Sequence, residues 1–397
     1  MVVKAKAPAI RFKGFTEDWE QRKLGDLMEI SSASRVHKNE WEDAGVPFFR
    51  SSDVVAEFKG TDNPKAFISY GLYEELVKKS GRVQKDDVLV TGGGSVGVPY
   101  LVKNNEPLYF KDADLIWLKN SGCVNGEFLF TFFTSANFRH YVNSIAHIGT
   151  ISHYTIEQAQ STPIYLPNKD EQNMIGQFFK HLDNLITLHQ RKLLKLKNVK
   201  TAMLEKMFPK NGSNVPEIRF AGFTDAWEQR KAIDIFRTTA DKNHPDLPVL
   251  SATQEYGMIL REDTGINISH DTENEATYKR VWPGQFVIHL RSFQGGFAHA
   301  NVDGITSPAY TVMDFIEPKT HYDFFWKYIF SSGKFIKSLE KVTYGIRDGR
   351  SISYDDFSTM SFLYSGFGEQ KAIGQLFQRL DHLITLHQRK PFLQKRR

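Results

Sequence analysis

The chain has 397 residues, a net charge of +5 and ordinary hydrophobic (41%) and charged (24%) fractions, which suits a globular protein of two or three domains. One cysteine, Cys123, excludes internal disulfides and cysteine-rich zinc sites, so a cytoplasmic location is expected. The N-terminal segment lacks the apolar core of a signal peptide, and no apolar run is long enough to predict a membrane span.

An entry motif opens each half of the chain. Residues 10–23 (Ile-Arg-Phe-Lys-Gly-Phe-Thr-Glu-Asp-Trp-Glu-Gln-Arg-Lys) return with few changes as residues 218–231. Each copy follows a proline, Pro8 or Pro216, and precedes a globular region. The chain is therefore predicted to be a duplicated protein.

The first globular region, residues 24–167, is predicted to mix strands and helices. Short apolar runs bounded by polar or glycine residues predict strands at 47–50 and 87–90. The phenylalanine-rich run at 128–133 predicts a buried helix, and the prolines of 163–167 predict an extended segment.

A glycine-rich stretch, Gly92-Gly-Gly-Ser-Val-Gly97, has the spacing of a dinucleotide-binding loop after a strand. Pro99 and its β-branched neighbours favour a second strand over a helix, however. Without a helix N-terminus there is no cradle for a pyrophosphate. The stretch is therefore predicted to be a hairpin between strands.

The strongest pattern is a repeated helix: residues 171–192 return as 369–390, with sixteen of 22 positions identical. Apolar residues recur at spacings of three, four and seven, which predicts one apolar face on each helix. We expect these faces, with one histidine each, to form a helix pair or subunit interface through Ile175, Phe178, Phe179, Leu182, Leu185, Ile186, His189, Ile373, Leu376, Phe377, Leu380, Leu383, Ile384 and His387.

The first helix is predicted to run from about Lys169 to Phe208. Proline inside a helix costs about 3 kcal/mol, so Pro391 should stop or kink the second near residue 390. Nine Lys/Arg and four acids between Lys169 and Lys210 account for the whole net charge. This basic helix is either a solvated face or a surface for a polyanion such as nucleic acid, and the sequence leaves both readings open.

The second globular region, residues 232–366, shares the strand rhythm of the first. Residues 280–288 align with residues 82–90, and the phenylalanine-rich run at 324–330 parallels the earlier helix. The loops between these elements diverge strongly. Similar scaffolds with different loops suit two modules that perform the same kind of task on different targets.

No catalytic constellation is found in the sequence. There is no phosphate-binding Gly-x4-Gly-Lys-Ser/Thr loop, no His-Glu-x-x-His motif and no Asn/Asp-Pro-Pro-aromatic motif of adenine methyltransferases. What remains are polar loops with residue types that read base edges, such as Arg for guanine and Gln for adenine. The candidate DNA-binding residues are Arg50, Ser51, Ser52, Gly92, Gly93, Gly94, Ser95, His147, Thr150, His153, Ser251, Thr253, Gln254, Arg291, Ser292, Gln294, Arg347 and Arg350.

The Trp-Glu-Gln-Arg-Lys entry, the Asp-Val-Leu-Val strand and the Glu-Gln-x-x-Ile-Gly helix start together resemble the specificity subunit of Type I restriction–modification enzymes. The resemblance covers nearly the whole chain. It implies an α+β fold in which two target recognition domains are separated by two long antiparallel helices. The implied plan is an entry motif plus recognition domain at 1–167, a spacer helix at 168–210, a second entry motif plus recognition domain at 211–366, and a C-terminal helix at 367–397.

The same resemblance implies a non-catalytic DNA reader. Each recognition domain would read one half of a bipartite site on double-stranded DNA. Two methyltransferase subunits and the restriction subunits would be the partners, and S-adenosylmethionine, ATP and magnesium would be bound by those partners, with no cofactor or metal on this chain. The alternative from a different class is a free-standing DNA-binding regulator that uses its basic helix directly.

Overall fold

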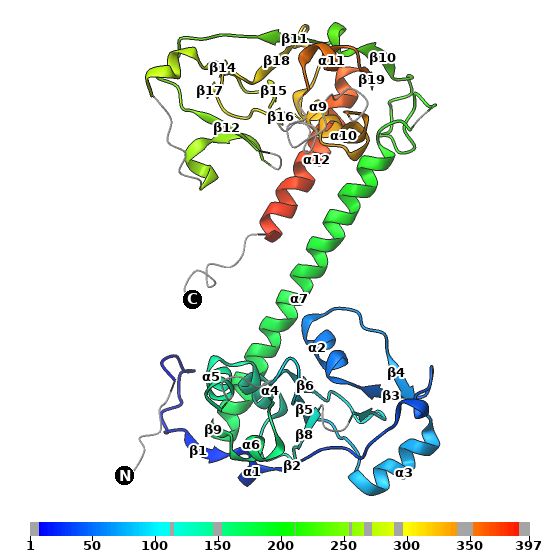
Figure 1. Ribbon diagram of the computed structural model, residues 1–397, viewed down its shortest axis with the longest axis vertical. Coiled ribbons are helices and arrows are strands. Elements are labelled where there is room, and N and C mark those ends of the chain that lie inside the picture. Colours follow the sequence, from blue (N-terminus) through cyan, green and yellow to red (C-terminus); the bar gives the residue numbers. More distant parts are fainter. Residues whose placement is uncertain are drawn as a thin grey trace. The chain divides into compact units, whose positions relative to one another are not determined.

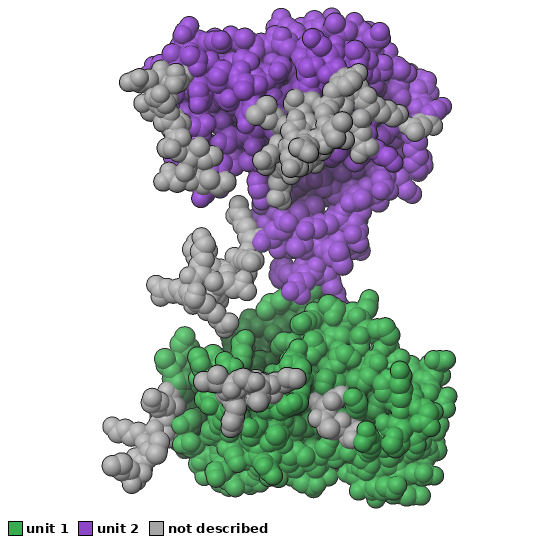
Figure 2. Space-filling view, viewed as in Figure 1, with its two compact units in different colours: residues 1–187 green, residues 188–397 purple. Residues whose placement is uncertain are grey.

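The computed structural model describes residues 8–388 except 112–114, 146–152, 211, 254–255, 266–271, 290–296 and 340–351. The chain forms two compact units, residues 1–187 and 188–397 (Figure 2). Both units combine helices with small, mostly antiparallel sheets, which confirms the predicted α+β class. No helix among the described residues is long and apolar enough to cross a membrane.

Unit 1 contains nine strands and six helices before the long helix, within the part of it that the structure describes. The elements in chain order are β1 (Glu20–Lys23), α1 (Leu24–Leu27), β2 (Glu29–Ser31), β3 (Val46–Phe49), α2 (Ser51–Lys59), β4 (Ala66–Ile68), α3 (Tyr70–Ser80), β5 (Val88–Thr91), β6 (Pro99–Leu101), β7 (Tyr109–Phe110), β8 (Leu115–Lys119), α4 (Gly126–Thr134), α5 (Ala136–Ile145), α6 (Ile156–Ser161) and β9 (Pro163–Leu166).

Unit 2 follows the same general plan. Its elements are β10 (Glu228–Lys231), β11 (Phe236–Thr239), β12 (Leu250–Thr253), β13 (Gly257–Leu260), β14 (Lys279–Val281), β15 (Phe286–Ile288), β16 (Ala298–His299), β17 (Gly304–Thr306), β18 (Thr311–Phe315), α9 (Asp323–Phe330), α10 (Gly333–Leu339), α11 (Tyr354–Ser358), β19 (Ser361–Tyr364) and α12 (Phe367–Gln388).

Each unit contains its own four-stranded sheet, and the strand order is equivalent in the two sheets. The order is β2-β8-β5-β6 in unit 1 and β11-β18-β15-β16 in unit 2, with antiparallel neighbours. The turn before the third strand is also built alike. Asp87 accepts a hydrogen bond from the Gln84 N–H, and Gln285 accepts one from the Trp282 N–H. The predicted alignment of residues 82–90 with 280–288 is therefore confirmed.

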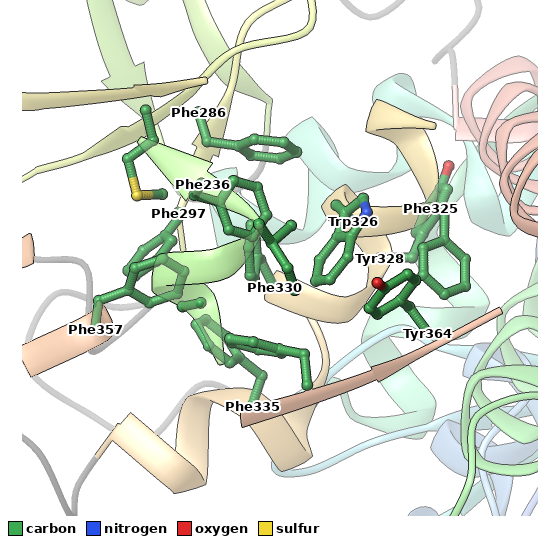
Figure 3. Close-up of a cluster of buried hydrophobic side chains, with 14 of the residues drawn as sticks. Phe236, Phe286, Phe297, Phe325, Trp326, Tyr328, Phe330, Phe335, Phe357 and Tyr364 are labelled. Carbon is green, nitrogen blue, oxygen red and sulfur yellow. The ribbon is translucent and has the colours of Figure 1, made fainter. Parts of the chain in front are cut away.

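Aromatic side chains fill the main core of unit 2. Phe330 is fully buried and lies against the rings of Phe236, Phe335 and Phe357 at centroid distances of 5.0 to 5.8 Å, as Figure 3 shows. Edge-to-face and tilted arrangements of this kind favour aromatic pairs beyond the apolar area they bury. The phenylalanine-rich segment thus forms a buried helix, α9, as predicted, and its unit 1 counterpart forms α4.

The long helix α7 (Lys169–Lys206) contains 38 residues and starts in unit 1 (Figure 1). Its bounds agree with the predicted helix to within two residues. In unit 2, His189 contacts His387 and Lys200 contacts Asp381, so α7 and α12 run antiparallel there. Pro391 lies outside the described residues, which end in α12 at Gln388.

The expected pairing of the two repeated apolar faces needs correction. In α12, Ile373, Phe377, Leu380 and Ile384 are buried, but the first three pack in the unit 2 core with the second half of α7. The reason is the antiparallel register. Because His189 lies opposite His387, residues near 380 face residues near 196 instead of the first repeat copy.

Candidate DNA interface and its anchoring

A buried ion pair ties each entry motif to the start of its helix. The Arg11 guanidinium donates through Nε and Nη2 to the two carboxylate oxygens of Glu171, both at 2.7 Å. Arg219 does the same to Glu369 at 2.6 and 2.8 Å. The Glu171 residue is fully buried and Glu369 nearly so. A bidentate pair fixes orientation as well as distance, so both entry motifs are held in one geometry.

The glutamine that follows each of these glutamates forms hydrogen bonds with backbone groups of neighbouring segments. Gln172 accepts from the Asn125 N–H at the start of α4 and donates to the Pro167 carbonyl. Gln370 accepts from the Tyr322 N–H at the start of α9 and donates to the Ser365 carbonyl. Each glutamine therefore joins the helix start to the phenylalanine-rich helix of its own unit.

The glycine of the Glu-Gln-x-x-Ile-Gly motif allows a close helix crossing. A Cβ at Gly176 would lie 2.9 Å from the Phe128 backbone nitrogen, and a Cβ at Gly374 would lie 2.6 Å from the Tyr322 ring. The Glu, Gln and Gly positions of this motif thus anchor α7 and α12 on their units.

The Glu-Gln-Arg-Lys end of each entry motif is a strand that closes its module. β1 pairs antiparallel with β9, and β10 pairs antiparallel with β19 in the same register. The predicted extended segment at 163–167 is thus a strand, and it joins the first and last parts of the module immediately before the helix begins.

The glycine loop and one histidine come together in unit 1. Residues 92–98 form the predicted hairpin between β5 and β6, with positive φ at Gly94 and Gly97. A Cβ at Gly93 would lie 3.5 Å from His153 Nδ1, and the Tyr154 N–H donates to the Gly92 carbonyl. Five of the candidate DNA-binding residues, Gly92–Ser95 and His153, therefore lie together, with Gly92 buried and Gly94, Ser95 and His153 exposed.

Arg50 has internal partners that the sequence did not indicate. Its guanidinium donates to both carboxylate oxygens of Asp53 at 2.7 and 3.0 Å and also to the Pro64 carbonyl. Burial opposes ionisation of Asp53, but hydrogen bonds from Arg50 and Asn63 hold its pKa below the usual range. The segment Arg50–Asp53 was expected to be a loop; it is instead the N-terminal turn of α2 and contains Ser51, while Ser52 accepts from Asn63.

Two candidates of unit 2 lie on a strand and not in the expected loop. Ser251 and Thr253 belong to β12, which forms a hairpin with β13. Thr253 Oγ1 donates to the Gly257 carbonyl and accepts from the Tyr256 N–H, so this hydroxyl shapes the turn. The exposed Tyr256 ring at the hairpin tip was missed, although an aromatic residue beside a polar turn was a usable signal.

The remaining candidates lie outside the described residues, and their contacts with DNA stay predictions. They are His147, Thr150, Gln254, Arg291, Ser292, Gln294, Arg347 and Arg350. Among the residues that the structure does describe, no three His, Cys, Asp or Glu side chains gather as a metal site would require.

His189 and His387 occupy equivalent positions in the two copies of the repeated helix and contact each other. His189 Nδ1 lies 3.2 Å from His387 Nδ1. Contact between equivalent positions is the signature of a two-fold relation between two elements. Desolvation, with nearby Lys192 and His189, lowers the pKa of His387. The two histidines, which were expected to belong to a helix pair, therefore lie where α7 and α12 run side by side.

The same module is thus built twice, and each copy is anchored on the start of a helix by the same motifs. Residues 16–198 match the family model of the Type I restriction modification DNA specificity domain. This match agrees, over residues 16–198, with the resemblance recognised from the repeated motifs.

Two relatives illustrate the likeness. A Haemophilus influenzae protein named as a type I restriction enzyme specificity subunit is 28% identical over 169 residues. That match spans 41% of this chain and 41% of the relative's length. The crystal structure of a Type-I restriction-modification system S subunit from M. genitalium has the same fold. Its TM-score is 0.55 at 14% identity, over 95% of this chain and 92% of that one.

Proposed function

We propose that this chain is the DNA-reading subunit of a type I restriction–modification complex, with one half of a bipartite site read by each unit. The proposal rests on one observation: the two units are anchored by the same contacts, although their loops differ. The Arg–Glu clamp, the glutamine contacts and the glycine crossing are made twice. Between these anchors the two units have different elements, such as α2 and α3 in unit 1 and the β12–β13 hairpin in unit 2.

The reading surface proposed for unit 1 is the glycine hairpin with His153. Backbone N–H groups of a glycine hairpin can approach phosphates closely, and a histidine beside it can donate to a base or a phosphate. For unit 2 the proposed surface is the β12–β13 hairpin with Ser251 and Tyr256. Arg50 is assigned to holding α2 through Asp53, so it supports the surface instead of contacting a base.

The chemistry on DNA is assigned to partner proteins. Methyltransferase subunits would bind S-adenosylmethionine and flip the target adenine, and restriction subunits would bind ATP and magnesium. The family relation and the shared anchoring support this division of labour. Outside its basic helix the chain has no excess positive charge, so DNA binding by the isolated chain should be weak and salt-sensitive.

The test is to co-express the chain with methyltransferase subunits of a type I system and to map N6-methyladenine in the host genome. We expect a bipartite methylated motif that requires this chain. Tight sequence-specific binding by the isolated chain, with no bipartite methylation, would instead favour a free-standing regulator.

A further inference from the structure

The β12–β13 hairpin of unit 2 rests on the short strand β16. Met258 of β13 forms a bridge with Ala300, which directly follows β16. A Cβ at Gly257 would lie 2.3 Å from the His299 carbonyl oxygen, so the hairpin backbone touches the backbone of β16. Gly257 also has a φ of +75°, so a residue with a side chain would be strained there. The position of the hairpin therefore follows the position of β16.

The side chain of His299 ties β16 to the start of α9. Its imidazole is 1% exposed, and its Nε2–H donates to Asp323 Oδ2 at 2.8 Å. The rings of Phe286 and Phe324 flank the imidazole at centroid distances of 5.1 and 4.8 Å. Burial lowers the pKa of His299, although the hydrogen bond to Asp323 opposes this shift. The pair is therefore a hydrogen bond from a neutral imidazole to a carboxylate, and bonds to a charged acceptor are short and strong.

Asp323 belongs to the anchored part of unit 2, because it is the first residue of α9. The residue before it, Tyr322, donates its N–H to Gln370 of α12, and the Tyr322 ring lies against Gly374. A continuous set of contacts therefore runs from the α12 anchor through the start of α9 and the His299–Asp323 pair to the hairpin.

Unit 1 has an apolar contact at the equivalent place. Leu101 occupies in β6 the register position that His299 occupies in β16. Gly126 is the first residue of α4, as Asp323 is of α9, and a Cβ at Gly126 would lie 3.1 Å from Leu101 Cδ1. The element that packs on this strand differs too: it is α2 on β6 in unit 1 and β13 on β16 in unit 2. The polar pair and the hairpin thus occur together in unit 2.

We propose that His299 and Asp323 are positioning residues for the β12–β13 hairpin: their hydrogen bond holds β16, and with it the hairpin, at a fixed place relative to α12. This inference rests on the proposed function, because it assigns the two residues a role in reading the half-site of unit 2. Neither residue contacts DNA in this assignment. The hydrogen bond itself carries the role, so a side chain that keeps the bond keeps the position of the hairpin.

Conservative substitutions separate the hydrogen bond from the packing of the pair. In Asp323→Asn the amide oxygen can still accept from His299, and in His299→Gln the amide nitrogen can still donate to Asp323. His299→Leu and Asp323→Ala remove the bond. His321→Phe is a matched control, because His321 is another buried histidine of unit 2, and its ring packs against Phe315 and Trp326.

Hydrogen exchange of the full-length chain tests the positioning without DNA. The amides of β13, residues 257–260, should lose roughly tenfold in protection in His299→Leu and Asp323→Ala. Their protection should stay close to that of the wild-type chain in Asp323→Asn, His299→Gln and His321→Phe. The amides of β10 and β19 should stay protected in every variant. Equal protection of β13 in Asp323→Ala and Asp323→Asn would overturn the proposal, and so would a loss of β10 and β19 protection in Asp323→Ala.

The methylated motif tests the role in reading. With methyltransferase subunits of a type I system co-expressed, Asp323→Ala should relax the bases of one half-site and leave the other half intact, and Asp323→Asn should give the wild-type motif. An unchanged motif in Asp323→Ala, or a motif relaxed in both halves, would contradict the role in reading. If the wild-type chain gave no bipartite motif, the proposed function would be refuted instead, and the exchange of the β13 amides would still decide whether the pair positions the hairpin.

Discussion

The close crossing of α12 over α9 gives the most direct test of how a module is anchored. The substitution Gly374→Ala adds a Cβ that would lie 2.6 Å from Tyr322 Cε1 and 3.1 Å from the Phe325 backbone nitrogen. The Tyr322 ring cannot turn away freely, because its hydroxyl donates to Gln378 at 3.0 Å. Overpacking of this kind costs about 1–3 kcal/mol.

A matched substitution in the same helix separates this contact from helix propensity. At Gly368 a new Cβ would meet only Phe223, at the ordinary distance of 3.6 Å. Alanine is favoured over glycine by roughly 1 kcal/mol inside a helix, and both variants share most of this gain. Gly374→Ala should therefore be less stable than Gly368→Ala by about 1–3 kcal/mol.

Thermal unfolding of the full-length chain, followed by far-UV circular dichroism, measures the difference. For a unit of this size about 2 kcal/mol corresponds to a Tm difference of roughly 4–8 °C. Hydrogen exchange of the α12 amides would assign the transition to unit 2. Equal Tm values for the two variants would refute the argument that glycine is needed for a close crossing.

Three further predictions concern single side chains. Glu171→Gln should make residues 8–19 more susceptible to limited proteolysis, because it breaks the buried bidentate pair with Arg11. Glu74→Gln, which removes an exposed pair with Arg82, should leave the cleavage rate of residues 8–19 unchanged. Equal cleavage rates for the two variants would contradict this. Burial lowers the pKa of His321 from 6.5 to about 4, so its contribution to stability is complete above pH 6.5 and is lost as the pH falls toward 4. Between pH 6.5 and 4, the free energy of unfolding should therefore fall less in His321→Phe than in the wild-type chain. An equal fall in both proteins, measured by chemical denaturation at the two pH values, would argue against that cause. Replacing His153 with Ala should weaken methylation of the bipartite site, because unit 1 would read its half less well, and should leave the Tm unchanged. A lower Tm with unchanged methylation would assign His153 a structural role only.

Much of the architecture could be predicted because it follows from local sequence patterns. The 3.6-residue periodicity placed α7 within two residues of its observed ends, and Pro99 correctly excluded a dinucleotide loop after Gly92. The internal repeat also identified His189 and His387 as equivalent positions, and the structure shows these two side chains in contact. These features depend on short-range spacing or on symmetry.

Contacts between distant segments could not be predicted from such patterns. The sequence gives an apolar face on α7 and on α12 but not the register that sets residues near 196 against residues near 380. Arg50 had the residue type of a base reader, and only the fold shows Asp53 and Pro64 within its reach. The roles of Glu171 and Gly176 likewise depend on Arg11 and α4, which are far away in the sequence.

Each unit is proposed to read one half of a bipartite site independently of the other. The most direct measurement exchanges residues 24–167 for the equivalent region of a specificity subunit with a different first half-site. Methyltransferase subunits are co-expressed, and N6-methyladenine is mapped across the genome. We expect a motif in which one half changes and the other half is retained. A motif in which both halves change, or neither changes, would contradict it.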